Sequence, residues 1–167
     1  MTAYPDTFAF VQIHHGDGYA TPWGNTRFTF YAGTGWPMTI FDGVLKHSGS
    51  HLYSIYQSEF LSRADEPTDV TIELTGDPVS GQTYSVEAKV CIESGGTGKT
   101  MRIYMVQVLD YWPASPSYHR NGFKQPADTH GSEPDITLAP GECQTIVREF
   151  TFDADSWASQ DDIKIVA

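Results

Sequence analysis

The sequence lacks several of the features from which a function is most often inferred. Its 167 residues contain two cysteines and no Cys-x-x-Cys, so the dithiol of a disulfide-exchange enzyme is missing. No apolar run approaches the roughly 18 residues that a membrane-spanning helix needs. Positive charge is scarce, because 10 Lys and Arg stand against 21 Asp and Glu and leave a net charge of −11. Such an excess of acid argues against nucleic acid or an anionic membrane as a partner.

The distribution of charge predicts two units. Residues 1–63 carry four acids and three bases, whereas the remainder carries 17 acids and 7 bases. The change in charge falls near Asp65-Glu66-Pro67, a segment that would end a helix. After Pro67 the pattern of apolar residues also changes, to the alternation of strands. We therefore expect one unit over residues 1–64 and a second over residues 68–167. The first residues show no basic segment followed by an apolar one, so no signal peptide is expected, and both ends look like cuts in a longer protein.

The pattern of the first unit predicts an α/β layer. A short apolar run at 8–13 predicts a buried strand, and residues 27–31 fit either a strand or a short helix. Met38–Phe41 predicts a strand that Asp42-Gly43 turns into a hairpin partner. Ser50 is then a candidate N-cap of a helix that runs from Leu52 to about Ala64. The predicted order is strand, helix or loop, strand, strand, helix.

The second unit predicts an antiparallel sandwich. Apolar and polar residues alternate over 70–75 and 84–92, as in strands with one buried face. Further β-rich runs follow at 101–109, 145–152 and 163–167, separated by turns rich in Gly, Pro, Ser and Asp. The segment 113–135 is too long for a simple hairpin and predicts an ordered excursion or a mobile loop. The fold class is therefore α+β.

The two cysteines, Cys91 and Cys143, leave two interpretations open. A disulfide between them would close a separation of 52 residues and stabilise the fold by about 4 kcal/mol. Two free thiols are the alternative, because the cellular compartment is not given by the sequence. A reactive cysteine is not expected, since no neighbouring residue would lower either thiol pKa.

Three motifs resemble ligand sites, and each has a structural explanation. The glycine-rich segment 95–100 lacks the first glycine of a phosphate-binding loop and precedes a β-rich run, so it predicts a hairpin turn. His14 and His15 are adjacent on a predicted strand and would point to opposite faces, which does not suit one metal ion. The acidic segment 153–162 lacks the glycine and the closing Glu of a calcium loop. We predict no catalytic residue, no metal and no cofactor.

The N-terminal third resembles a thioredoxin-like fold from which the first strand and the first helix are missing. Together with the sandwich it is similar to a bacterial family of secreted, outer-membrane-associated thioredoxin-like proteins of the Omp type, in which the sandwich would be immunoglobulin-like. The matching segments are the strand at 8–13, the aromatic segment 27–31, the segment 35–43, the helix from Leu52, residues 118–122 and the strand at 163–167.

The resemblance implies that Trp36, Pro37 and Met38 form a substrate-facing cis-proline loop. The Cys-x-x-Cys that this loop would face is absent, so we expect a non-catalytic fragment of an exported protein with a binding or structural role. The resemblance places it outside the cell, in the periplasm or at the outer membrane. Two alternatives stay open: a thiol-disulfide oxidoreductase whose active-site half lies upstream, and a sandwich module that binds a protein or glycan partner.

Overall fold

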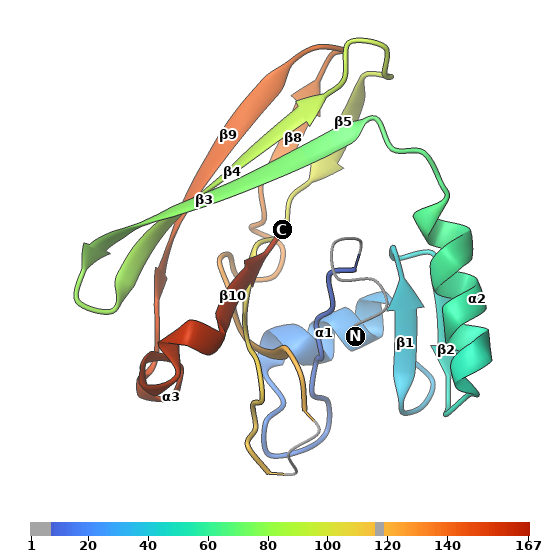
Figure 1. Ribbon diagram of the computed structural model, residues 1–167, viewed down its shortest axis with the longest axis vertical. Coiled ribbons are helices and arrows are strands. Elements are labelled where there is room, and N and C mark those ends of the chain that lie inside the picture. Colours follow the sequence, from blue (N-terminus) through green and yellow to red (C-terminus); the bar gives the residue numbers. More distant parts are fainter. Residues whose placement is uncertain (1–7, 116–118) are drawn as a thin grey trace.

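The computed structural model describes residues 8–115 and 119–167, and they combine helices with antiparallel strands in the expected α+β class. Tyr118, one residue of the resemblance, lies outside these ranges. Figure 1 shows the arrangement of the elements. In chain order they are α1 (Pro22–Phe30), β1 (Met38–Phe41), β2 (Leu45–Ser48), α2 (Tyr53–Ala64), β3 (Val70–Ser80), β4 (Thr83–Ile92), β5 (Lys99–Arg102), β6 (Val106–Leu109), β7 (Gly122–Pro126), β8 (Asp135–Leu138), β9 (Cys143–Thr151), α3 (Ala154–Ala158), η1 (Gln160–Asp162) and β10 (Ile163–Val166).

The long sheet consists of β3, β4 and β9, paired antiparallel in that order. Its central strand shows the alternation expected from the sequence, because Val86, Ala88, Val90 and Ile92 are buried while Glu87 and Lys89 are exposed. We call the side on which these four apolar residues lie the inner face. The strands predicted over 70–75 and 84–92 are therefore confirmed.

A second layer covers the inner face of β4 and β9. It is built from the antiparallel sheet β10–β6–β7 and the antiparallel pair β5–β8. Ile136 and Leu138 of β8 pack into one core with Val90 of β4 and Phe150 of β9. The run predicted as one strand at 101–109 is divided into β5 and β6, which join different sheets. The core of the protein lies between these two layers.

Helix α1 packs on the other side of the β10–β6–β7 sheet. Thr21 caps the helix by accepting the Gly24 backbone N–H at 3.0 Å, and Pro22 occupies its first turn. Trp23 then stacks on Phe123 of β7 with ring centroids 4.8 Å apart. Of the two interpretations of residues 27–31, the helix is the one that forms. It also brings the N-terminal residues into contact with strands of the predicted second unit.

The predicted strand at residues 8–13 does not form. Gln12 makes a single parallel bridge to Gly122, with its N–H donated to the Asn121 carbonyl at 3.0 Å. Phe8 and Ile13, which the apolar run suggested were buried, are exposed. The segment lies along the end of β7 instead of entering a sheet of its own. Its apolar side chains make separate contacts: the Phe8 ring lies 5.2 Å from that of Phe60, and Val11 packs on the cluster around Trp23 and Phe123.

The hairpin and the helix after it form close to where the sequence places them. Asp42 and Gly43 have φ angles of 49° and 70° and join β1 to β2, which pair antiparallel. Helix α2 begins later than predicted: Leu52, not Ser50, is the N-cap residue, and no side chain caps it. Among the described residues, β1 and β2 form a two-stranded sheet that no third strand joins.

Candidate binding groove between β3 and β10

The predicted cis-proline loop is present as a backbone feature. The Trp36–Pro37 peptide bond is cis, and the Pro37 carbonyl accepts the Gly49 N–H at 2.7 Å. Trp36 is exposed and its ring lies 6.0 Å from that of Phe28. Met38 begins β1. Neither cysteine lies in this part of the chain, so a substrate-facing role of the loop stays a prediction.

The two cysteines form a disulfide across the long sheet. Cys91 and Cys143 are direct cross-strand partners on β4 and β9, on the side opposite the inner face. Of the two interpretations left open by the sequence, the bridged form is the one in the structure. The bond ties the middle strand of the sheet to its edge, and no free cysteine remains among the described residues.

The histidines do not assemble into a metal site. The His14 Nδ1–H donates a hydrogen bond to the Asp17 carboxylate at 2.7 Å, while His15 stacks on Phe28 with ring centroids 4.2 Å apart. The two side chains therefore have separate surroundings, although residues 14 and 15 do not lie on the strand that the sequence predicts. Within the described ranges, no three His, Cys, Asp or Glu side chains are grouped so that they could hold a metal.

The glycine-rich segment 95–100 is a turn between two layers, not a hairpin between paired strands. The strand before it, β4, pairs with β3 and β9, whereas β5 after it pairs with β8. The Thr97 N–H and the Lys99 ammonium both bond to the carboxylate of Asp69. Because a strand follows the turn, the helix N-terminus of a phosphate-binding loop is missing here.

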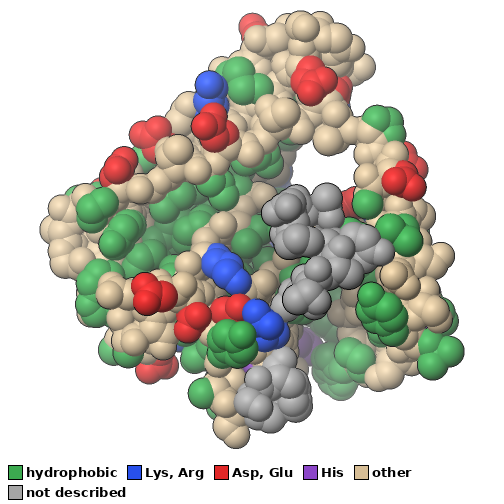
Figure 2. All heavy atoms as spheres, viewed as in Figure 1, with side chains coloured by type: hydrophobic (Ala, Val, Ile, Leu, Met, Phe, Trp, Pro, Cys, Tyr) green, Lys and Arg blue, Asp and Glu red, His purple; other side chains and the backbone are tan. Residues whose placement is uncertain are grey.

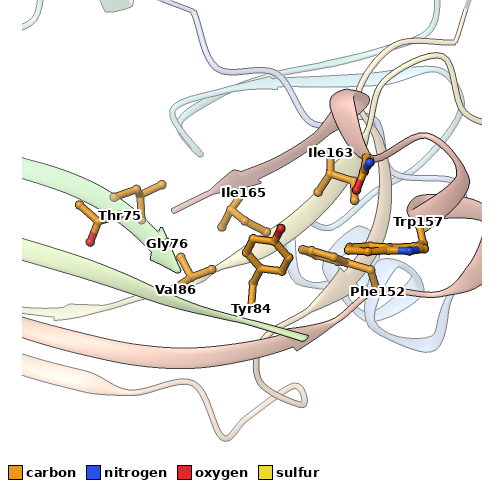
Figure 3. Close-up of a pocket in the computed structure, with 10 residues that line it drawn as sticks. Thr75, Gly76, Tyr84, Val86, Phe152, Trp157, Ile163 and Ile165 are labelled. Carbon is orange, nitrogen blue, oxygen red and sulfur yellow. The ribbon is translucent and has the colours of Figure 1, made fainter. Parts of the chain in front are cut away.

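The clearest candidate site is a groove of about 340 Å³ between the long sheet and the C-terminal strand. Figure 3 shows aromatic side chains on one side of it and two isoleucines of β10 on the other. Tyr84 lies close to both Phe152 and Trp157, with ring centroids 5.6 Å and 6.4 Å away. The lining residues are Leu74, Thr75, Gly76, Tyr84, Val86, Phe152, Trp157, Gln160, Ile163 and Ile165.

The groove is open because the second layer stops short of β3. Ile72 and Leu74 lie on the inner face, opposite Val90 and Ala88 of β4. The two β4 residues are 0% exposed, whereas Ile72 is 43% and Leu74 is 37% exposed. Figure 2 shows the resulting gathering of hydrophobic side chains in the hollow below β3. One edge of the apolar core is thus accessible to solvent.

Two strand edges border this opening. In the described residues β3 and β10 are each the outer strand of their sheet. The Asp110 N–H donates to the Asp162 carbonyl at 3.0 Å, which fixes the phase of the ladder between β6 and β10. In an antiparallel ladder, hydrogen-bonded and non-hydrogen-bonded residue pairs alternate. Asp162 is hydrogen-bonded to Asp110, so the next residue, Ile163, is not hydrogen-bonded to β6, and Lys164 is. Ile165 therefore directs its backbone N–H and C=O groups to the free edge. Ile163 directs its C=O there, whereas its N–H donates to the Gln160 carbonyl.

Charged residues follow the β10 side of the groove. The Lys164 ammonium donates to the Asp110 carboxylate at 3.1 Å and to the Asn121 side chain at 2.9 Å, yet half of its side chain is exposed. Two hydrogen bonds from Arg120 hold the pKa of Asp110 well below its ordinary value. Asp161 is exposed just before β10. The rim therefore presents a positive side chain beside a negative one.

The lining of the groove is mostly apolar and aromatic. Its polar lining residues are Thr75, Tyr84 and Gln160, and no Asp, Glu, His or Cys is among the lining residues. Apolar and aromatic walls with few polar groups are typical of ligand sites, which span roughly 300–1,000 Å³. An apolar surface with unpaired strand edges fits a polypeptide better than a small polar metabolite.

This groove could not be predicted from the sequence. The alternation over 70–75 is the same as in β4, and period-2 alternation does not distinguish a central strand from an edge strand. One signal was available: Pro78 lies within β3, and proline is confined to edge strands because it cannot donate to a ladder. That β10 would lie opposite β3 could not be inferred from either segment alone.

No protein-family model, no curated protein and no solved structure matches the chain. None of the helices in the described part of the chain has the length and apolar character needed to cross a membrane.

Proposed function

We propose that the chain is a non-catalytic, polypeptide-binding module of an exported protein, and that the groove between β3 and β10 is its binding surface. The observation that carries the proposal is the exposure of Ile72 and Leu74 on the inner face of a sheet that is otherwise covered. An apolar surface of this kind costs free energy when it faces water, at about 25 cal/mol for each Å². A partner that covers it gains that free energy.

The exported location rests on two supports. Disulfides persist in oxidising compartments and are rare in the cytosol, and Cys91 is bonded to Cys143. The resemblance to secreted thioredoxin-like proteins with an immunoglobulin-like sandwich points the same way. The absence of a strand at residues 8–13 is the feature that fits this ancestry least.

A glycan is a weaker candidate than a polypeptide. Sugar-binding platforms need aromatic rings on one exposed surface, and the tryptophans of this chain are dispersed. Trp23 stacks on buried Phe123, Trp36 lies near Phe28, Trp112 faces Lys124, and Trp157 lines the groove. An oxidoreductase role would require a dithiol outside this chain, because both of its cysteines are bonded to each other.

The proposal is tested by selecting linear peptides from a random display library on the immobilised chain. Enriched peptides are then measured against the wild type, Leu74→Glu and Thr71→Glu. Thr71 is exposed on the other side of the same strand, so the second variant adds the same charge outside the groove. We expect binding to be lost in Leu74→Glu and kept in Thr71→Glu. No enrichment, or equal binding to all three proteins, would contradict a function in the groove.

A further inference from the structure

The geometry points to the occupant: we propose that the groove takes an extended segment of a partner protein, which adds to β10 as a further antiparallel strand. This inference rests on the proposed function, since it names the ligand class of the same groove. Backbone groups of β10 and charged residues beside it would select that ligand. Three independent features of the groove carry the inference.

The first feature is the unpaired backbone of β10. The Ile165 N–H and C=O and the Ile163 C=O point away from β6 and are unpaired, while the Ile163 N–H is bonded to the Gln160 carbonyl; both side chains line the groove. The same two residues thus offer hydrogen bonds and apolar contact to one ligand. Only an extended polypeptide carries donors and acceptors at the spacing of a strand edge, so a lipid or a sugar would leave these groups unsatisfied.

The second feature is the position of the space. A strand beside β10 would extend the second layer over β3, because sheets in a sandwich stack about 10 Å apart. Its inward side chains would cover Leu74 and Ile72, which are the uncovered residues of the inner face. A strand added to the edge of β3 instead would widen the long sheet and leave these two side chains uncovered. The β10 edge is therefore the acceptor.

The third feature is the charge along the rim. A residue opposite Lys164 would lie on the side of the sheet where that half-exposed ammonium contacts Asp110 and Asn121. Exposed Asp161 lies in the 3-10 turn just before β10, and the end of the partner strand would pass this turn. Opposite charges on neighbouring strands attract, and like charges repel. An acidic residue is thus favoured opposite Lys164, and a basic residue at the end of the partner strand.

The orientation follows from the rest of the fold. Every named strand pair of the described residues is antiparallel, and the antiparallel ladder is slightly more stable per residue. Read from its N-terminus, the partner strand is then apolar, acidic, apolar, polar and basic. The apolar residues face Ile165 and Ile163, and the acidic one faces Lys164.

A synthetic peptide with the central sequence Val-Glu-Val-Ser-Lys tests this inference on the full chain by isothermal titration. The matched control is Val-Lys-Val-Ser-Glu, which has the same composition with its charges exchanged. We expect the control to bind about fivefold more weakly. The Lys164→Gln variant should reduce that difference, because it removes the charge that the glutamate faces while it keeps a side chain of similar length.

N-methylation of the peptide separates strand addition from simple apolar binding. A methyl group on the amide of the second Val, which opposes Ile163, blocks a hydrogen bond to β10 and should weaken binding about tenfold. A methyl group on the Glu amide, which points away from β10, should have little effect. Equal effects at the two positions would show that the peptide does not pair with β10.

The outcomes distinguish this inference from the proposed function. Peptide binding that Leu74→Glu abolishes, but that ignores N-methylation and charge order, would keep the groove as a binding surface and overturn strand addition. A dimer that forms through β10 and is not displaced by the peptide would make a second copy of the chain the occupant and also overturn the inference. If the library selects no peptide at all, the proposed function itself fails.

Discussion

Ile72 provides a direct test of whether the inner face of β3 is uncovered. The substitution Ile72→Ala removes three carbon groups from an edge residue that is 43% exposed. Ile146→Ala makes the same chemical change on the same face of the sheet, at a residue of β9 that is 6% exposed. The pair therefore isolates the effect of the covering layer from that of the side chain.

The expected costs differ clearly. Three buried carbon groups are worth about 2.4 kcal/mol at ~0.8 kcal/mol each. Because Ile72 is little more than half covered and leaves no enclosed cavity, Ile72→Ala should lower the free energy of unfolding by about 1 kcal/mol. Ile146→Ala leaves a cavity in the core as well, and substitutions of this kind cost about 2–5 kcal/mol.

Urea denaturation of both variants, with the disulfide intact, measures these costs. Tryptophan fluorescence and circular dichroism should give coincident transitions, and the slopes should match the wild type if the unfolded state is unchanged. Equal losses for Ile72→Ala and Ile146→Ala would refute the reasoning. They would mean that the inner face of β3 is covered in solution.

Three further predictions concern the rest of the molecule. The pKa of Asp110 is lowered in the folded chain by its hydrogen bonds from Arg120, so on acidification the unfolded chain takes up the proton first. Its stabilisation is therefore complete above about pH 4 and declines as the pH falls towards the folded pKa. Asp110→Asn should remove that part of the acid dependence in a series of urea titrations. Replacing Cys91 and Cys143 by Ser opens a loop of 52 residues and should cost up to about 4 kcal/mol, seen as a lower urea midpoint with no change in peptide specificity. The purified chain should not reduce insulin, and catalytic turnover in that assay would contradict a non-catalytic role.

The strands could be predicted where the side-chain pattern and the turn chemistry agree. Alternation over 84–92 marks β4 because each buried residue is followed by a polar one. Asp42-Gly43 marks the hairpin because both positions need a positive φ, which these two residues tolerate well. These features depend on neighbouring residues alone, so the strand and the turn can be predicted from the sequence.

Features that depend on distant partners could not be predicted in this way. The apolar run at residues 8–13 has the composition of a buried strand, but a strand needs a neighbour, and only Gln12 finds one. The run at 101–109 is uniformly β-rich, yet the chain changes sheets within it. The composition of a segment indicates that it can form a buried strand, but it does not indicate which sheet the strand will join.

In the candidate site, too, local features could be predicted and features that depend on distant segments could not. Trp36 and Pro37 could be named from a short motif, and their peptide bond is cis, but what the loop binds does not follow from that geometry. The groove was missed because it forms where β3 and β10 meet, and these strands are distant in the sequence. The proline in β3 was the one local sign that the strand lies at an edge.

The most direct test of the proposed polypeptide-binding groove is amide hydrogen exchange of β10, measured by NMR with and without the Val-Glu-Val-Ser-Lys peptide. In the free chain the amide of Ile165 should exchange faster than that of Lys164, which is bonded to β6. At a peptide concentration a hundred times the Kd, exchange at Ile165 should slow by about 100-fold. Slow exchange of the Ile165 amide in the free chain, or no change when the peptide binds, would contradict the account.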